Sequence, residues 1–348
     1  MPLSLFTCRC GGAVARHFLA LCAVFVPLCS PAAPAAAPKP LRAVIEVFIG
    51  EMARKHGFEA EALRRAFRQV ESRPAVIRAM TAPATAKPWY EFRSRHVTAE
   101  RIAEGVEFWK RNAVTLARAN RDFGVPEEII VAIIGIETHY GRNTGTFKVL
   151  EALATLAFDY PPRAEFFSAE LEQYLLLARE EGLELLGVQG SYAGAIGIAQ
   201  FLPSSYRRYA IDFDGDGRRR LSSSMADAIG SVANYLQAFG WQRDGAIAVA
   251  ADVGESGIDA VLTMAGLKPG IRIGELRRGG VTPLAPVSDE LAAALFSVET
   301  ETGPRYWLGL QNFYVITRYN RSINYAMAVR ELAHGLRAQL EANKAAAQ

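Results

Sequence analysis

Eight consecutive non-polar residues, Ile129 to Ile136, lead directly into a carboxylate, Glu137. A run of this kind has no polar side, so the fold must surround it with other apolar segments. Periodicity cannot decide between a buried helix and a buried strand here, and the β-branched residues would suit a strand. The preceding stretch, Gly124 to Glu128, is typical of a helix start: a glycine break, a proline for the first turn and two acids that favour the helix dipole. We therefore predict a buried helix that ends near Glu137.

The position of Glu137 predicts an unusual carboxyl group. At the end of a buried apolar helix it is poorly solvated, and desolvation disfavours its charged form. Its pKa should therefore rise, which would leave the group able to donate a proton near neutral pH. A structural role is the alternative, in which Glu137 forms a salt bridge with Arg142 or caps a neighbouring element. These residues alone leave both interpretations open.

The rest of the chain has a mainly helical pattern. Apolar positions recur at helical spacing from Leu41 to about Asp122, and Ala164 to Glu181 and Asp227 to Phe239 also predict helices. From Ala246 to Pro286, short apolar runs between glycines and prolines predict a small β-containing insertion. Helices are expected again from Asp289 to Glu341. We expect these parts: an N-terminal helical lobe at 41–122, a catalytic core at 123–245, a small β-containing lobe at 246–288, and C-terminal helices returning to the core at 289–348.

The first forty residues differ from the rest. Arg9 and Arg16 precede an apolar run from Phe18 to Leu28, followed by small residues and prolines, which is the order of a secretory signal peptide. The run is too short to cross a bilayer as a permanent helix. We therefore expect a signal peptide at 1–32, an Ala/Pro linker at 33–40, and a secreted protein without a transmembrane span after processing.

All four cysteines lie in this leader, so the processed chain would form no disulfide. Cys29 could instead attach a lipid, but Leu28 in front of it is bulkier than such processing sites usually tolerate. Without Arg9 and Arg16 the net charge falls from +3 to +1. A nearly neutral chain gives no electrostatic reason to bind nucleic acid.

Several motifs stand around Glu137 in a defined order. They are Gly135-Ile136-Glu137-Thr138-His139-Tyr140-Gly141-Arg142, Ala152 to Pro161, Gly190-Ser191-Tyr192-Ala193-Gly194-Ala195-Ile196-Gly197, and Gln200-Phe201-Leu202-Pro203-Ser204-Ser205-Tyr206. Together they resemble the membrane-bound lytic transglycosylase B family. The resemblance also takes in Phe108-Trp109 and Tyr319-Asn320-Arg321-Ser322, so it covers nearly all of the chain after the leader. It implies a mainly α protein: a lysozyme-like (α+β) core with an added helical lobe and a small β-containing lobe.

The resemblance also implies the chemistry. In that family the glutamate matching Glu137 is the lone acid and base, the substrate is the glycan strand of peptidoglycan, and the product carries 1,6-anhydro-N-acetylmuramic acid. Ordinary glycosidases need two carboxylates, and this sequence forces no second one. The N-acetyl carbonyl of the substrate would stabilise C1, and no cofactor would take part. Complexes with other cell-wall enzymes are left open.

The family further implies a set of substrate-binding residues. Ser191 and Gln200 match positions around the sugar and its N-acetyl group, and Tyr235, Tyr319 and Asn320 match positions that line the cleft. The glycines of 187–197 would let the backbone approach a sugar closely, although a tight loop packed on a helix is the alternative.

Aromatic rings offer a second way to hold a sugar. Phe92, Trp89 and Tyr140 could stack on sugar faces, with a place in the core as the alternative for each. His139 has no partner histidine or cysteine at a metal-ligand spacing, so we expect a hydrogen-bonding or surface role for it.

An acidic loop, Asp212-Phe213-Asp214-Gly215-Asp216-Gly217, has the spacing of an EF-hand-type calcium loop. Ser223 stands where such a loop has its bidentate glutamate, and the family closes a similar loop with a later aspartate, here Asp227. The predicted ligands of one structural Ca²⁺ are Asp212, Asp214, Asp216, Arg218 and Asp227. A solvated acidic turn, partly neutralised by Arg218-Arg219-Arg220, is the alternative.

Two other functions use the same residues. A hydrolytic muramidase would use Glu137 with a water molecule, and an inactive peptidoglycan-binding scaffold would keep the fold but lose Glu137 or the Ser191 loop. Both of those features are present. A calcium sensor explains least, because one imperfect loop does not make a paired EF-hand unit.

Overall fold

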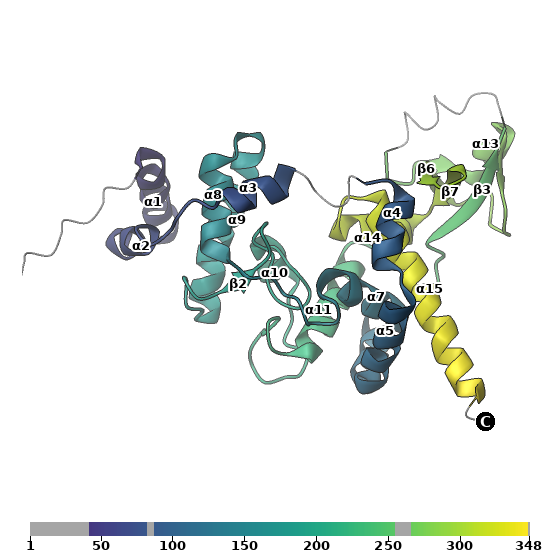
Figure 1. The fold of residues 1–348 in the computed structure, drawn as a ribbon, viewed down its shortest axis with the longest axis horizontal. Coiled ribbons are helices and arrows are strands. Elements are labelled where there is room, and N and C mark those ends of the chain that lie inside the picture. The colour runs from purple at the N-terminus through teal and green to yellow at the C-terminus, as the bar shows by residue number, and fades with distance from the viewer. Residues whose placement is uncertain (1–41, 82–86, 255–265, 347–348) are drawn as a thin grey trace, which may run out of the picture. The chain divides into compact units, whose positions relative to one another are not determined.

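The computed structural model describes residues 42–81, 87–254 and 266–346 (Figure 1). The fold is mainly helical with a small antiparallel sheet, as the sequence predicts. The helices are α1 (Ala43–His56), α2 (Ala60–Phe67), α3 (Pro74–Thr81), α4 (Trp89–His96), α5 (Ala99–Arg111), α6 (Ala113–Phe123), α7 (Glu127–Thr138), α8 (Val149–Asp159), α9 (Ala164–Glu181), α10 (Pro203–Tyr209), α11 (Met225–Ala238), α13 (Ile273–Arg278), α14 (Gln311–Tyr319) and α15 (Ile323–Ala346), with the 3-10 turn η2 (Pro161–Arg163) before α9.

The expected leader falls outside the described residues. This applies to the signal peptide at 1–32, the linker at 33–40 and the lipid-attachment question at Cys29. Within the residues that the structure does describe, no helix combines the length and the apolar character that crossing a membrane requires.

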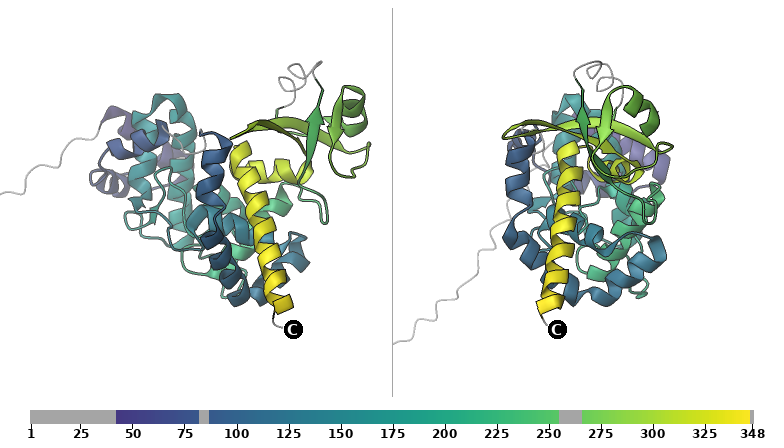
Figure 2. Two further views of the ribbon diagram at one scale, coloured as in Figure 1. Left: turned by 45° about the vertical axis from the view of Figure 1, so that its right-hand side comes forward. Right: turned by 90° about the vertical axis from the view of Figure 1, so that its right-hand side faces the viewer.

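Helix α7 is the predicted buried helix, and it begins at the expected place. Pro126 precedes its first residue, and every residue from Ile129 to Gly135 is buried. Helices α5, α6, α11 and α15 pack around it. Figure 2 shows the long α15, in yellow, running beside the blue helices, and α15 packs against α4 and α5. The two acids of the first turn gain partners as well: Glu127 accepts a hydrogen bond from the indole of Trp109 at 2.5 Å, and Glu128 pairs with Arg337 at 2.6 Å.

The glycine-rich loop that follows α9 is fixed beside α7. A short antiparallel pair, β1 (Phe147–Lys148) with β2 (Gln189–Gly190), anchors its start. Gly145 has φ +95°, and a Cβ atom there would collide with the carbonyl of Gly190, so only glycine fits. Isolated antiparallel β-bridges then join Gly190 to Ile196 and Ile196 to Phe201.

Thr138, at the end of α7, ties the helix to this loop. Its buried hydroxyl donates to the carbonyl of Ile198 at 2.9 Å and accepts from the backbone N–H of Gly141 at 3.0 Å. The chain then turns through two residues with positive φ, His139 and Tyr140. The last turn of α7, which carries Glu137, is thereby held by side-chain contacts as well as by its own helical bonds.

The sheet is larger than the sequence predicts. Its order is β4-β6-β7-β3-β5, all antiparallel, with a small apolar core of its own that is separate from the main core. Its strands are β3 (Ala248–Val253), β4 (Ile271–Arg272), β5 (Val281–Pro283), β6 (Ala292–Thr300) and β7 (Gly303–Gly309).

The helices expected from Asp289 onwards are wrong for the first twenty residues. Strands β6 and β7 form a hairpin there, and helices return only with α14. The alanines of Ala292-Ala293-Ala294 favour a helix by intrinsic propensity. Pairing with β7 and burial of Ala293 to Phe296 outweigh that preference, because strand formation depends mostly on packing against neighbours.

Replacing Thr138 by valine keeps the shape of the side chain but removes both of its loop contacts. Since the groups left behind are buried, we expect the free energy of unfolding in urea to fall by about 1–3 kcal/mol. Thr81→Val is the matched control, because within the described part of the chain this exposed hydroxyl bonds only to carbonyls of its own helix; its change should stay within about 0.5 kcal/mol. Equal losses in the two variants would contradict the role given to Thr138.

Candidate active site

Glu137 lies at the second-last position of α7, with its side chain partly exposed. Its Oε1 atom accepts a hydrogen bond of 2.6 Å from the hydroxyl of Tyr325, a buried residue of α15. The salt bridge to Arg142 that the sequence left open is not formed, because Arg142 pairs with Glu104 of α5. The carboxyl group of Glu137 therefore faces a hydroxyl partner and not a cation.

The surroundings of Glu137 give it the raised pKa that the sequence predicts. Burial raises the pKa of this carboxyl group to about 7, against a hydrogen bond from Tyr325 that lowers it. Among the described residues, no other carboxylate and no cation contributes to the shift. A group with this pKa is present both protonated and ionised near neutral pH, which suits an acid that must also act as a base.

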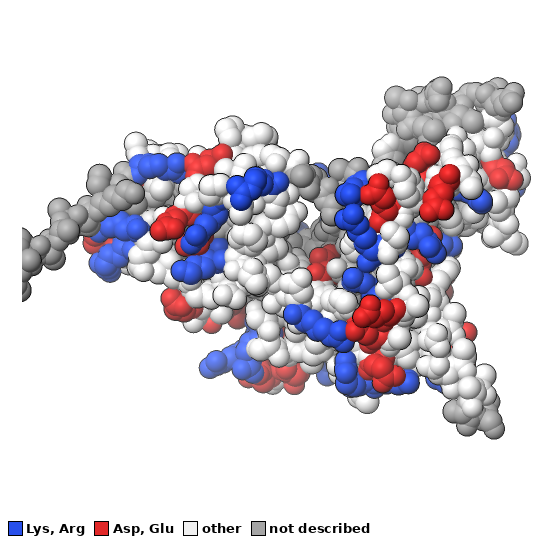
Figure 3. Space-filling view, in the orientation of Figure 1, with Lys and Arg blue, Asp and Glu red and all other residues white. Residues whose placement is uncertain are grey.

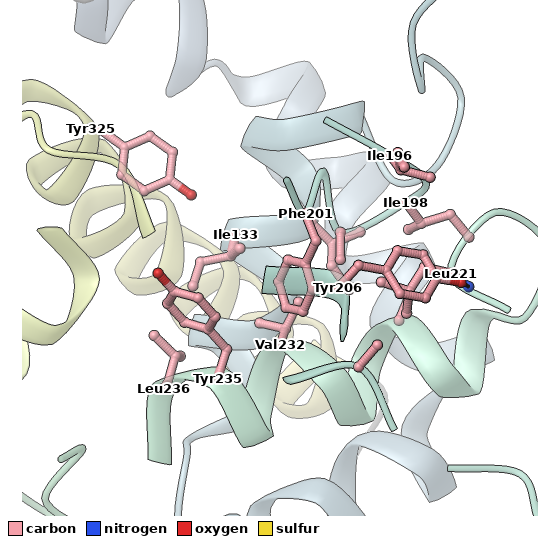
Figure 4. Close-up of a cluster of buried hydrophobic side chains, with 14 of the residues drawn as sticks. Ile133, Ile196, Ile198, Phe201, Tyr206, Leu221, Val232, Tyr235, Leu236 and Tyr325 are labelled. Atoms are coloured by element: carbon pink, nitrogen blue, oxygen red, sulfur yellow. Dashed lines mark hydrogen bonds between the residues drawn. The ribbon is translucent and has the colours of Figure 1, made fainter. Parts of the chain in front are cut away.

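Three tyrosines from three helices surround the carboxylate: Tyr235 of α11, Tyr319 of α14 and Tyr325 of α15. The rings of Tyr235 and Tyr319 are 4.9 Å apart, and those of Tyr319 and Tyr325 are stacked at 6.4 Å. Burial raises the pKa of all three phenols, and the charge of Glu137 raises each further. Figure 4 shows the hydroxyl oxygens of Tyr235 and Tyr325 in the space between the two rings. All three phenols therefore remain neutral and able to donate.

Tyr235 and Tyr319, predicted to line the cleft, lie close enough to Glu137 to feel its charge, but their hydroxyls are already engaged. Tyr235 donates to the carbonyl of Arg318 at 2.6 Å, and Tyr319 donates to the carbonyl of Ala199 at 2.6 Å. The second bond joins the end of α14 to the glycine-rich loop beside Gln200. These two tyrosines thus hold the walls of the site in position.

Tyr325 is the site residue that the sequence reasoning missed. It makes the one hydrogen bond to the carboxylate of Glu137 among the described residues. Its only signal in the sequence is its place three residues after the motif Tyr319 to Ser322. A long-range contact between α7 and α15 cannot be read from either segment alone.

Ser191 and Gln200 shape the loop from within. The hydroxyl of Ser191 accepts hydrogen bonds from the backbone N–H groups of Ala193 at 3.2 Å and Ala195 at 3.1 Å. Gln200, at φ +51°, donates its amide to the carbonyls of Thr144 at 3.0 Å and Gly197 at 2.8 Å. Both side chains stay partly exposed, so they can meet a ligand while they hold the loop.

Asn320 ends α14 in an extended conformation, and its side chain is partly exposed. Its backbone carbonyl accepts from Ser322 at 2.7 Å, and its amide group bonds to no described residue. Since it follows Tyr319 directly, it stands beside the tyrosine cluster with a free donor and a free acceptor.

The structure departs from the sequence prediction at Phe92. This residue of α4 is only 3% exposed, and its ring stacks on His96 at 4.0 Å. Trp89 and Tyr140 are also buried. The rings of these three residues pack in the core. A core role, the alternative predicted from the sequence, therefore describes them better than sugar stacking does. His139 forms a hydrogen bond with Glu104, as expected for a hydrogen-bonding histidine.

Three of the predicted metal ligands converge. Asp212, Asp214 and Asp227 each offer a carboxylate oxygen, and these atoms lie within 4.8 Å of one another. Carboxylate oxygens at this density are the donors that Ca²⁺ prefers. Asp227 is fully buried at the start of α11 and accepts the backbone N–H groups of Phe213 at 2.8 Å and Arg220 at 2.7 Å. The residues therefore fit a calcium ion, with Asp227 closing the loop.

One predicted carboxylate ligand, Asp216, does not join that group. The carboxylate of Asp216 pairs with Arg220 and accepts the N–H of Arg218 at 3.0 Å. Asp216 is thus neutralised by the arginine run, which was the concern raised by the sequence. Arg218 is exposed, and its N–H bond to Asp216 keeps it in the turn.

Known proteins resemble this chain over most of its length. A family model described as Transglycosylase SLT domain matches residues 41–334. Membrane-bound lytic murein transglycosylase B of Escherichia coli (strain K12) is 44% identical over 299 residues, which cover 83% of this chain and 81% of that protein.

Solved structures give the same result. The Escherichia coli lytic transglycosylase Slt35 in complex with calcium is 43% identical, with a TM-score of 0.77, and the match covers 85% of this chain and 93% of that one. SltB3 from Pseudomonas aeruginosa in complex with NAG-anhNAM-pentapeptide is 31% identical, with a TM-score of 0.71, and the match covers 84% of this chain and 78% of that one.

The fold is therefore the lysozyme-like fold of these enzymes, and the resemblance noted in the sequence is confirmed. The family model spans most of the chain, and the Escherichia coli relative shares 44% of the aligned residues. This chain belongs to the lytic murein transglycosylases that carry the transglycosylase SLT domain.

Proposed function

We propose that this protein is a lytic transglycosylase that cleaves the β-1,4 bond between N-acetylmuramic acid and N-acetylglucosamine, with Glu137 as its only acid and base. The observation that carries the proposal is the isolation of Glu137: a carboxyl group with a pKa of about 7 and one neutral hydrogen-bond partner. A related protein binds NAG-anhNAM-pentapeptide, a ligand with an anhydro-sugar. This supports the same product for this chain.

The proposed reaction has two proton transfers. Protonated Glu137 gives its proton to the glycosidic oxygen as the bond from that oxygen to C1 breaks, and the N-acetyl carbonyl of the substrate stabilises C1. The C6 hydroxyl of the same sugar then attacks C1, and Glu137 takes up the hydroxyl proton. The carboxyl group ends as it began, the product is the 1,6-anhydro sugar, and no water is consumed.

The neighbouring side chains suit this cycle. Tyr325 donates to Oε1 of Glu137, which fixes the carboxyl group, and the proposed reaction uses the other oxygen for the substrate. We assign Asn320, Gln200 and Ser191 to the sugar and its N-acetyl group, since each is partly exposed beside the cluster or in its loop. Tyr235 and Tyr319 support these residues from behind through their bonds to backbone carbonyls.

A hydrolytic muramidase would differ only in its last step, where water would replace the C6 hydroxyl. The product mass separates the two, because the anhydro product lacks the added water. An inactive peptidoglycan-binding scaffold is the other alternative. It would be favoured if the wild-type protein cleaved no glycan strands at all.

We also propose a secreted, periplasmic protein with one structural Ca²⁺ held by Asp212, Asp214 and Asp227. The relative Slt35 is known in complex with calcium. The acidic loop and α11 meet at this group of carboxylates, so a bound ion would stabilise the fold and would play no part in the chemistry.

Replacing Glu137 by glutamine should abolish the release of anhydro-muropeptides from purified sacculi. The amide keeps the shape and can still accept the bond from Tyr325, but it cannot transfer a proton. We expect turnover to fall by at least about a thousand-fold. Mass analysis of the products measures this loss. The matched control is Glu104→Gln, an acid on α5 paired with Arg142, which should retain turnover. Anhydro products from Glu137→Gln would eliminate the mechanism.

The stability of the same variant relative to the wild type should rise with pH. Because folding raises the pKa of Glu137 from 4.5 to about 7, its contribution to stability is present below pH 4.5 and is lost as the pH rises through 7. The free energy of unfolding of Glu137→Gln relative to the wild type should therefore increase between pH 4.5 and 7, by at most about 3 kcal/mol. Urea denaturation at several pH values would test this, and a pH-independent difference would refute it.

Calcium should raise the melting temperature by a few degrees, as expected for an ion that binds only the folded chain. Asp214→Asn should remove most of this increase, because it takes away one of the three converging carboxylates. Asp216→Asn should preserve it, because Asp216 pairs with Arg220 instead. Thermal melts of each protein with calcium and with a chelator would test these predictions. Identical melting curves for the wild type under the two conditions would show that the loop binds no calcium.

A further inference from the structure

Three consecutive arginines, Arg218-Arg219-Arg220, follow the acids of the calcium loop directly. Calcium is held by oxygen ligands, and cations next to them repel a divalent ion. Figure 3 shows basic and acidic side chains next to one another over the loop that precedes α11, at the lower edge of the view. Neither the reaction proposed for Glu137 nor the group of three converging carboxylates uses these arginines.

The three arginines have different partners. Arg219 pairs with Glu181 at the end of α9. The side chain of Arg218 is exposed and forms no ion pair within the described part of the chain. Arg220 pairs with an acid of the loop itself, Asp216. Arg220 is therefore the arginine of the run that acts directly on a carboxylate of the loop.

Asp216 stands at the fifth position of the loop, where the spacing of calcium loops places a ligand. Both of its carboxylate oxygens are engaged. One pairs with Arg220, and the other accepts the backbone N–H of Arg218 at 3.0 Å. The three converging carboxylate oxygens lie within 4.8 Å of one another without it. The ion pair with Arg220 thus accounts for the missing fourth carboxylate.

The backbone of Arg220 is fixed to the same site, but its side chain is not. Its N–H donates to Oδ2 of the buried Asp227 at 2.7 Å, and Asp227 is one of the three converging acids. The side chain of Arg220 is 48% exposed and lines a hollow of about 270 Å³ together with Glu181. It can therefore turn away from Asp216 while the loop keeps its backbone conformation.

The number of charged ligands sets the calcium affinity of such loops. We propose that Arg220 withholds Asp216 from the calcium ion, so that the loop binds the ion through three carboxylates and with low affinity. The inference rests on the proposed calcium site. The loop then fills only where calcium is abundant, with a dissociation constant in the range of extracellular calcium modules, about 10⁻⁴ to 10⁻³ M.

The test is a calcium titration of the purified protein by isothermal calorimetry. Arg220→Gln should lower the dissociation constant about five-fold, the equivalent of one surface ion pair. Arg218→Gln is the matched control. It removes the same charge from the same run but breaks no ion pair, and exposed charges are screened by salt, so the constant should change by less than about two-fold.

A second substitution shows whether the released carboxylate becomes a ligand. Asp216→Asn should leave the dissociation constant of the wild type within about two-fold. In the Arg220→Gln background the same change should raise the constant about five-fold, because Asp216 binds the ion only there. This non-additivity separates a withheld ligand from two independent effects on charge.

The outcomes distinguish this inference from the calcium site on which it rests. If neither the wild type nor Arg220→Gln binds calcium, the proposed site fails. If both bind, equal effects of Arg220→Gln and Arg218→Gln would show that the arginines act through net charge alone, and the inference is wrong. An equal loss of affinity on Asp216→Asn in both backgrounds also overturns it, because Asp216 would then be a ligand in the wild type already.

Folding of the variants is checked by thermal melts in the presence of a chelator. Arg220→Met guards against a single misfolded variant. It keeps an unbranched apolar side chain without the charge, so it should give the same gain in calcium affinity as Arg220→Gln. A gain in only one of the two variants would contradict release of Asp216 as its cause.

Discussion

The burial of α7 is the constraint on which the rest of the structure depends. Its apolar run leaves no face for solvent, so four helices close around it and carry Glu137 to a place where water is scarce. A carboxyl group there keeps its proton to higher pH than one in water, since the charged form loses hydration. The same burial that stabilises the core therefore supplies the acid, and it places a charge where charge is costly.

That cost is limited by a neutral environment and not by a salt bridge. Tyr325 gives Glu137 one hydrogen bond, while the nearby cations go elsewhere: Arg142 to Glu104, and Arg101 to the carbonyl of Gly135. An arginine at hydrogen-bond distance would lower the pKa of the carboxyl group and hold it ionised. A tyrosine orients it and leaves it able to exchange a proton. The choice of partner thus matters as much for the chemistry as the depth of burial.

Local signals in the sequence were sufficient to predict the elements that depend on residues close to one another along the chain. The start of α7 follows from Pro126 and its acids, α9 from a clear apolar face, and the acidic loop from its spacing. Long-range contacts were beyond such signals. Tyr325 is hydrogen-bonded to Glu137, 188 positions away in the chain. The alanine-rich segment of β6 forms a strand because it pairs with β7. The ring of Phe92 is buried and stacks on His96. Asp216 has the spacing of a ligand, but Arg220 takes its carboxylate.

The most direct measurement of the central claim is the titration of the glutamate side chains by carbon NMR with the carboxyl carbons labelled, in the wild type and in Glu137→Gln. Burial of one isolated carboxyl group predicts a single resonance that titrates near pH 7 and is absent from the variant. If every glutamate of the wild-type protein titrates at or below its ordinary value of about 4.3, Glu137 is solvated and cannot be the acid described here.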